Sequence, residues 1–149
     1  MIQAVKATPL RDEFIDALHA RQLEGQDLLP KPARHQVPDE TVKSIAEYVD
    51  HLLAGNRPEK DLHEYALQLG ALWGHMVEKA YGWRWQHLEF DDESQGIYLV
   101  SPHAWYRFPP LHFLNRILSG KNNNTVMDLF SMMDNIENNP PQKPYQIIA

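Results

Sequence analysis

The sequence predicts an α+β domain in which about five helices pack around a small antiparallel β-hairpin or three-stranded sheet. Apolar residues recur at helical spacing in segments before residue 82 and again after residue 109. Between these segments, short stretches are rich in aromatic and branched side chains, which is typical of strands. The chain has 149 residues, of which 43% are hydrophobic, so we expect a single domain over residues 1–149.

The first helix is expected near residues 9–23. Thr8 followed by Pro9 is typical of an N-cap with proline at the first helical position. The apolar residues that follow at helical spacing are Leu10, Phe14, Ala17 and Leu18. Residues 24–38 break this pattern with Gly25 and three prolines, so we predict a Pro-rich surface connection there.

Two further helices carry continuous apolar stripes. The second is expected to begin at Asp39, a favourable capping residue, and to end at Gly55. The third is expected to follow Pro58 and to end at Gly82. It has the longest stripe: Leu62, Tyr65, Ala66, Leu69, Trp73, Met76, Val77 and Ala80.

The third helix also contains two glycines, Gly70 and Gly74, which lie on one side of it because they are four residues apart. A glycine inside a helix costs about 1 kcal/mol of stability relative to alanine. We therefore predict that a strand or another helix approaches the backbone closely at these positions.

The central segment predicts an antiparallel hairpin. Its strands are Trp83 to Phe90 and Gly96 to Ser101, with a polar turn between them, and a third strand is expected at Ala104–Phe108. On the first strand, Trp83 and Trp85 share a face with His87 and Glu89. Either part of this tryptophan face is accessible, or both faces of the hairpin are half covered.

The last third of the chain predicts two helices and a tail. Pro109-Pro110 is typical of a helix start, and this helix is expected to end at Gly120. A fifth helix is expected after the cap Asn124 or Thr125, with its apolar face continuing to Ile136. Residues 138–149 form a Pro-rich tail, whose P-x-x-P sequence we interpret as part of the chain end.

Composition excludes several chemistries. Without cysteine, the chain cannot form disulfides, thiolate zinc sites, iron–sulfur clusters or a cysteine nucleophile. It contains no G-x-S-x-G, G-x-G-x-x-G or G-x-x-x-x-G-K sequence, so hydrolase-elbow, dinucleotide and P-loop chemistry are not indicated. We predict no cofactor, no catalytic residue set and no metal. The net charge of −6 argues against a nucleic-acid partner.

Histidine and carboxylate residues nevertheless form two patterns that could carry chemistry. His75 and Glu78 lie three residues apart on the third helix, but a bundle metal site needs further ligands from other helices. His87, Glu89 and Asp91 alternate along a strand and project from one face. This cluster is either a proton relay or ion site, or the solvated face of a hairpin, and the second interpretation is favoured.

No segment of the sequence indicates targeting or membrane insertion. The first residues lack the apolar stretch of a signal peptide, and no apolar run reaches the roughly 18 residues needed to cross a bilayer. We expect a cytoplasmic protein without a membrane partner.

The middle of the chain resembles a family of small uncharacterised bacterial domains. The resemblance covers about residues 62–133 and rests on four features. They are L-G-x-x-x-G at Leu69–Gly74, G-W-x-W at Gly82–Trp85, a Pro-initiated helix ending at Ser119-Gly120, and the stretch Asn124–Phe130. Some relatives accompany secreted or contact-delivered toxins, so the resemblance implies a possible immunity role. It implies no catalytic residues.

These observations predict a non-enzymatic protein-binding domain that recognises a basic protein, with immunity against a toxin as the implied role. One-signed charge beside large aromatics suits such a surface. The predicted partner-binding residues are Glu89, Asp91, Asp92, Glu93 and Trp105. Two alternatives stay open: a small hydrolase that uses the His87, Glu89 and Asp91 cluster, and a regulatory or structural subunit.

Overall fold

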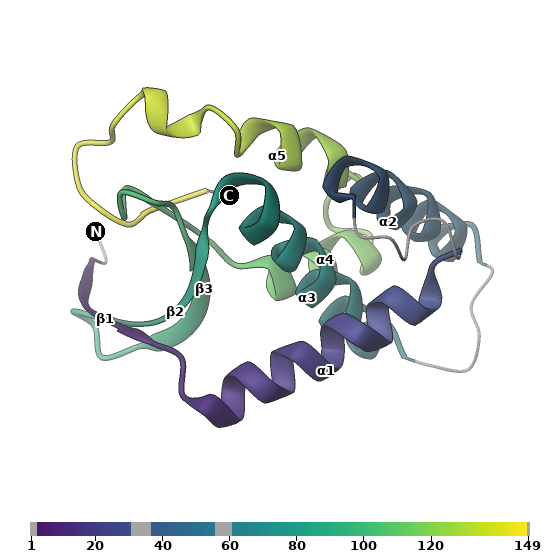
Figure 1. Cartoon of the computed structure of the whole chain (residues 1–149), viewed down its shortest axis with the longest axis horizontal. Helices are drawn as coiled ribbons and strands as arrows, with labels where there is room; N and C mark the ends of the chain where they lie inside the picture. Colours follow the sequence, from purple (N-terminus) through teal and green to yellow (C-terminus); the bar gives the residue numbers. More distant parts are fainter. Residues whose placement is uncertain (1–2, 31–36, 56–60, 149) are drawn as a thin grey trace.

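The computed structural model describes residues 3–30, 37–55 and 61–148. These ranges form an α+β structure with five α-helices and one five-stranded sheet in the order β1-β2-β3-β4-β5. Figure 1 shows the sheet at one end of the molecule and the helices beside it, with α1 and α2 on opposite sides of α3. The α+β class is therefore confirmed, whereas the sheet is larger than the predicted two or three strands.

The two additional strands come from the two ends of the chain. Each neighbouring pair is antiparallel except β4 and β5, which are parallel. β1 is an edge strand beside β2, and β5 is the opposite edge beside β4. The strands are β1 (Ala4–Pro9), β2 (Arg84–Phe90), β3 (Gln95–Val100), β4 (Tyr106–Phe108) and β5 (Gln146–Ile147).

The N-terminal prediction is wrong in its boundaries. Thr8 and Pro9 do not begin a helix but end β1, where they pair with His87 and Gln86 of β2. Proline is tolerated there because β1 is an edge strand. The helix that follows, α1, spans Asp12–Leu28 and is longer than predicted.

The predicted connection over residues 24–38 is also wrong in part, because α1 continues through Gly25 to Leu28. Gly25 does not break the helix. It brings α1 against the backbone carbonyl of Gln68 in α3, in a space that a β-carbon would occupy. Residues 31–36 of the predicted connection and Pro58 lie outside the described residues.

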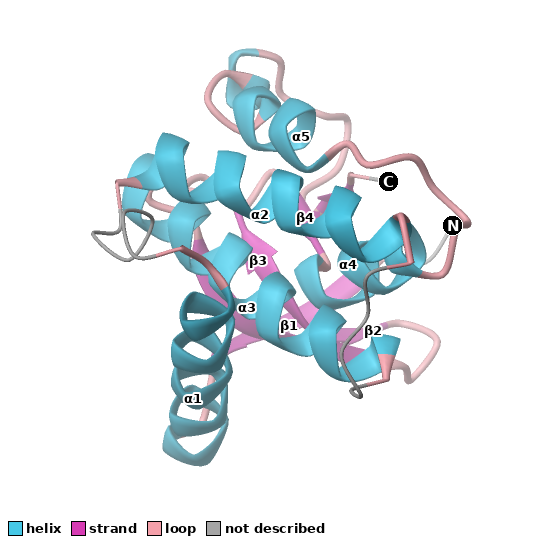
Figure 2. Ribbon diagram, turned by 90° about the vertical axis from the view of Figure 1, so that its right-hand side faces the viewer, coloured by secondary structure: helices cyan, strands magenta, loops and turns pink. Residues whose placement is uncertain are grey.

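The remaining helices are α2 (Pro38–Leu53), α3 (Leu62–Tyr81), α4 (Pro110–Leu118) and α5 (Val126–Met132). Helix α3 is the central element and packs against α1, α2 and α4. It begins where the Asp61 side chain accepts a hydrogen bond from the Glu64 N–H at 2.8 Å. It ends at Gly82, which has the left-handed conformation, φ 76°. Figure 2 shows α2, α3 and α4 in front of one face of the sheet.

Two other helix boundaries differ from the prediction. Helix α2 starts at Pro38 with Val37 as its N-cap, so Asp39 lies in the first turn and is not the cap. Helix α5 stops at Met132, and Ile136–Asn138 form a separate short 3₁₀ turn. Within the described residues, no helix is both long and apolar enough to cross a membrane.

The main core lies between the helices and the sheet, around the fully buried Trp73. Its ring packs against Phe108 and Phe113 at centroid distances of 5.2 and 5.3 Å, and its Nε1 donates to the Val126 carbonyl at 3.1 Å. The predicted close packing at the α3 glycines is confirmed. A β-carbon at Gly70 would lie 2.9 Å from the Pro110 carbonyl oxygen of α4.

A second, smaller core covers the other face of the sheet. It contains the buried Leu88, Phe90 and Val100. Arg107 stacks over the Phe90 ring at 4.5 Å, and its Nε donates to the Tyr145 carbonyl at 3.0 Å. Both faces of the hairpin are thus covered near the tryptophans, since Trp83 is only 2% exposed and Trp85 packs on α3.

The predicted tail, residues 138–149, does more than end the chain. Gln146 and Ile147 form β5 in parallel with β4. Ile148 is buried in the main core, and its N–H donates to the Arg107 carbonyl at 3.0 Å. The interpretation of this segment as a simple chain end is therefore wrong.

Candidate functional site

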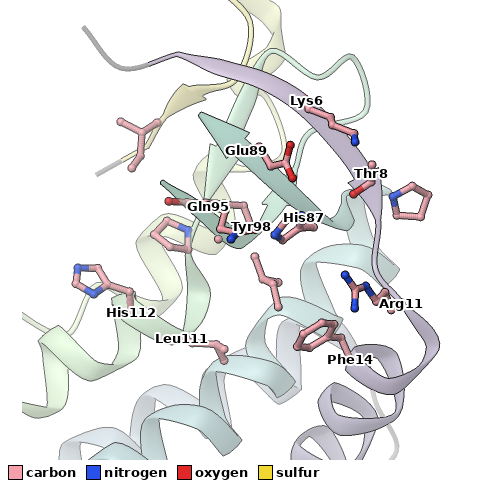
Figure 3. A pocket seen from close by; sticks show the side chains of 15 residues that line it. Lys6, Thr8, Arg11, Phe14, His87, Glu89, Gln95, Tyr98, Leu111 and His112 are labelled. Carbon is pink, nitrogen blue, oxygen red and sulfur yellow. The ribbon is translucent and has the colours of Figure 1, made fainter. Parts of the chain in front are cut away.

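The candidate site is an open groove of about 1080 Å³ where the sheet extends past the helices. Helix α3 covers the sheet at Trp85, but β2 continues beyond it to His87 and Glu89. Figure 3 shows these side chains between the sheet and the first turns of α1 and α4. The groove takes residues from β1, β2, β3, β5, α1 and α4, so it is assembled from both ends and the middle of the chain.

Strand register explains which side chains meet in the groove. Thr8 of β1 pairs with His87 of β2, and His87 pairs with Ile97 of β3. Residues directly opposite each other on neighbouring strands have β-carbons about 4.5–5.5 Å apart. These three residues therefore form one row across the sheet.

A second row follows one step further along the strands. It consists of Lys6, Glu89 and Gln95 in the same strand order. Because the side-chain period of a strand is two, both rows point to the same face as Trp85. Glu89 thus lies between a cationic neighbour and a neutral one.

The groove lining carries charges of both signs. Lys6 and Arg11 are its cationic residues. Among the described residues that line the groove, Glu89 is the only carboxylate, and it lies on β2 between Lys6 of β1 and Gln95 of β3. The walls are also partly apolar: Phe14 is 43% exposed, and Leu111 faces it from the first turn of α4.

The predicted His87, Glu89 and Asp91 cluster is divided. His87 and Glu89 line the groove, whereas Asp91 lies in the exposed β2–β3 turn outside it. There the Asp91 carboxylate accepts from the Gln3 N–H at 3.2 Å, and the Asp91 N–H donates to the Gln3 carbonyl at 2.9 Å. Asp91 therefore holds Gln3 beside the turn.

The other two acidic residues of the turn are also exposed but differ in their contacts. The Asp92 carboxylate accepts from the N–H and the hydroxyl of Ser94 at 3.0 and 2.5 Å, and these hydrogen bonds lower the pKa of Asp92. Glu93 has a positive φ of 70°, and its N–H donates to the Phe90 carbonyl. Asp92 thus shapes the turn through its side chain, and Glu93 does so through its backbone.

Trp105 does not join the acidic residues. It lies in the loop between β3 and β4, at the opposite end of β3 from the turn. The six residues of β3 separate the two by roughly 20 Å at about 3.3 Å per residue. Trp105 is half-buried and stacks on the His103 ring at a centroid distance of 5.0 Å. The structure therefore places the predicted partner-binding residues in two separate patches.

Comparison with known proteins gives no relative. No protein-family model matches the chain, and neither a curated protein nor a solved structure does so.

One polar cluster beside Trp105 was not apparent from the sequence. Glu137 accepts hydrogen bonds from the Ser101 hydroxyl at 2.5 Å and the His103 N–H at 3.0 Å, and it lies 2.9 Å from His103 Nδ1. Burial opposes ionisation of Glu137, but these hydrogen bonds outweigh it and lower its pKa. Glu137 is 36 residues from Ser101 in the chain, and no local pattern links them.

This cluster contains the residue types of a hydrolase triad in a different arrangement. In a triad the histidine lies between the nucleophile and the acid, so that it can take the hydroxyl proton. Here the Ser101 hydroxyl donates directly to the carboxylate, and its oxygen accepts from the Tyr106 N–H at 3.0 Å. The arrangement joins the β3–β4 loop to the C-terminal segment.

The metal-site patterns can also be compared with the structure. His75 and Glu78 share a face of α3 as predicted, with His75 Nδ1 3.5 Å from the carboxylate. The same Glu78 oxygen accepts from Trp85 Nε1 at 3.0 Å, so it also fixes the indole. Over residues 3–30, 37–55 and 61–148, no three His, Asp or Glu side chains converge on a position for a metal ion.

Proposed function

We propose that this chain is a non-enzymatic protein-binding domain that recognises a basic protein at the open end of its sheet. The groove carries the proposal, because it is wide, reaches the surface and takes side chains from six elements. Neutralisation of a basic toxin, as an immunity or inhibitor protein, is the biological role that we propose for this binding.

The chemistry of the groove supports a protein ligand. Apolar side chains such as Phe14, Ile97 and Leu111 alternate there with polar ones. A mixture of this kind is typical of non-obligate protein interfaces, which have an apolar centre and a polar rim. Phe14 is a large aromatic that retains substantial exposure, and such residues often anchor complexes.

The charge of the acidic turn, and not that of the groove lining with its Lys6 and Arg11, supports a basic partner. The exposed Asp91, Asp92 and Glu93 lie at the end of the same hairpin that brings Glu89 into the groove. A cluster of one sign on a chain of net charge −6 accelerates the encounter with an oppositely charged partner. Trp105 belongs to this interface only if the partner reaches along the whole length of β3.

The test starts with capture of the partner and measurement of its association rate at low and high salt. Asp91 and Asp92 also hold the turn by hydrogen bonds, so the cleaner variant is Glu89→Gln with Glu93→Gln. We expect its on-rate to fall several-fold at low salt and to depend less on salt. The matched control neutralises two exposed acids of α2, Glu40→Gln with Glu47→Gln, and should leave the on-rate near that of the wild type.

An equal on-rate for the wild type and the Glu89/Glu93 variant would show that these carboxylates only solubilise the turn. Trp105→Ala provides the second arm, since loss of an anchoring aromatic raises the dissociation rate more than it lowers the association rate. Because Trp105 is half-buried, the free energy of unfolding of this variant is measured with its binding.

A hydrolase is the second candidate, because His87 and Glu89 do share the groove. A histidine two residues from a carboxylate on one strand face can take a proton from water. A screen against ester, phosphate and amide substrates tests this directly. Activity that His87→Asn abolishes, in a variant that still folds, would favour the enzyme.

A further inference from the structure

Among the described residues, strand β3 has a free edge beside the groove. β4 pairs only with Leu99 and Val100, at the far end of β3. The preceding part of the strand, residues 95–98, has β2 on one side and the groove on the other.

The hydrogen-bond pattern shows which backbone groups point into this free side. The Phe90 N–H donates to the Ser94 carbonyl at 2.9 Å, so these opposite residues form a hydrogen-bonded pair. In an antiparallel ladder such pairs alternate with pairs whose N–H and C=O groups point away from each other. It follows that Gly96 and Tyr98 bond to β2, whereas Gln95 and Ile97 direct their backbone groups outward.

The other side of β3 agrees with this assignment. The Ser101 N–H donates to the Tyr106 carbonyl at 3.0 Å, so Leu99, two residues earlier, also directs its backbone groups toward β4. Ile97 and Gln95 direct their backbone groups to this same side of β3, but no described strand pairs with them there. No hydrogen bond joins the outward groups of these two residues to any described part of the chain.

Two prolines leave this edge free. After Phe108, continued pairing would place Pro109 opposite Tyr98 and Pro110 opposite Ile97. Proline has no N–H to donate to a neighbouring strand, and Pro110 instead begins α4. The chain turns away, and the groove remains between the β3 edge and the first turn of α4.

We propose that an extended segment of the partner adds as a strand to β3, bonding to the backbone of Gln95 and Ile97. This inference rests on the proposed protein-binding function and specifies how the partner is held. In such complexes the backbone hydrogen bonds supply affinity, and alternate side chains supply specificity.

The surroundings define the chemistry of the segment. In the bound segment, the residue opposite Ile97 has its side chain on the same face of the sheet as Ile97 and lies near Leu111. We therefore expect a branched apolar residue at this position of the segment. The residue opposite Gln95 lies in the row of Glu89, two strand spacings or about 10 Å away, within reach of a Lys or Arg side chain. The segment thus carries a basic and a branched apolar residue two positions apart.

Charge also decides between a foreign segment and a second copy of this chain. Edge-to-edge pairing of two copies would bring two chains of net charge −6 together, with the acidic turn of each near the new junction. Repulsion between these like charges disfavours association of the two copies. A basic segment has a charge opposite to the net charge of the chain and to that of the acidic turn.

The experiment measures binding of fluorescent eight-residue peptides to the full chain. One peptide alternates Thr with Val and Lys in turn (Thr-Val-Thr-Lys-Thr-Val-Thr-Lys), so that Val and Lys lie two positions apart on one face. A second has Glu in place of Lys, and a third is the Val/Lys peptide N-methylated at Val and Lys. We expect only the unmethylated basic peptide to bind, with N-methylation lowering its affinity at least about tenfold, because it blocks strand pairing without altering the protein.

A protein variant tests the position. Ile97→Pro removes an outward N–H and leaves the bonds of Gly96 and Tyr98 to β2, so peptide affinity should fall at least about tenfold. Ile97→Thr keeps the N–H and should bind within a few-fold of the wild type. Val5→Pro is the control. It introduces a proline into β1, on the other side of β2, at a residue that has no partner in the β1–β2 register, and it should leave peptide binding unchanged.

The proposal is overturned if N-methylation has no effect, if the acidic peptide binds equally well, or if neither peptide binds. It is also overturned if the wild type is a dimer that Ile97→Pro converts to a monomer. Should Ile97→Pro not fold, the N-methylated peptide alone decides. If binding of a captured partner depends on Glu89 and Glu93 but not on Ile97, the proposed protein-binding function is supported and strand addition to β3 is contradicted.

Discussion

The indole of Trp85 occupies the space that a β-carbon at position 74 would fill. Gly74 lies on the side of α3 that faces the sheet, and the Trp85 ring packs directly on its backbone. Trp85 Nε1 donates to Glu78, one turn further along α3. The pair sets the distance between α3 and β2, and the uncovered strand beyond it, at His87 and Glu89, becomes the groove.

Gly74→Ala is expected to destabilise the fold by about 1–3 kcal/mol, because the new methyl group overlaps the indole. In a Trp85→Leu background, the same change should cost less or even stabilise, since alanine is favoured over glycine in a helix by about 1 kcal/mol. Chemical denaturation of the four proteins of this cycle measures the coupling. Equal effects of Gly74→Ala in both backgrounds would contradict the packing role of this contact.

Glu137→Gln is expected to lower the free energy of unfolding by about 1–3 kcal/mol at pH 7. One carboxylate oxygen accepts from both the Ser101 hydroxyl and the His103 N–H, and the other lies 2.9 Å from His103 Nδ1. The amide replaces one of these oxygens by an NH₂ donor and removes the charge that strengthens the remaining hydrogen bonds. The exposed Glu40→Gln serves as the control and should change stability little.

The effect of Glu137→Gln should also depend on pH. The folded-state pKa of Glu137 lies below its ordinary value of 4.5, so its contribution is complete above that pH. It is lost as pH falls through the lower folded-state pKa, where the carboxylate becomes protonated. The difference between wild type and variant should therefore shrink in acid, as measured by denaturation between about pH 7 and pH 3. A difference that is constant over this range would contradict the assignment.

Arg107→Lys is expected to destabilise the fold by about 1–2 kcal/mol and to loosen the C-terminal strand. Lysine keeps the charge but loses the planar stacking over Phe90 and Tyr98 and the Nε bond to the Tyr145 carbonyl. Hydrogen exchange at the Ile148 N–H, which donates to the Arg107 carbonyl, reports on β5.

The exposed Arg84→Lys on β2 is the matched control for this prediction. It should leave both stability and exchange at Ile148 close to the wild type. If the two lysine variants behave alike, the stacked guanidinium does not hold the C-terminal segment.

The sequence alone determined those helices and strands whose residue patterns lie within the element. Helix α3 has a long apolar stripe and a glycine in the left-handed conformation at its end, and both were apparent from residue spacing. The hairpin of β2 and β3 follows from alternation and a polar turn. Gly70 and Gly74 were correctly interpreted as sites of close packing, because a glycine inside a helix costs stability that only a near neighbour offsets.

The tertiary structure alone decided the rest. β1 and β5 are short segments at the chain ends, and each becomes a strand because a distant partner satisfies its backbone hydrogen bonds. Trp105 is separated from the acidic turn because the two lie at opposite ends of β3. Asp91 lies outside the groove that contains His87 because β2 ends at Phe90. The groove and the free β3 edge exist because α3 stops covering the sheet at Trp85 and two prolines end β4. The spatial relation between such distant segments follows from packing and strand register, which local residue patterns do not encode.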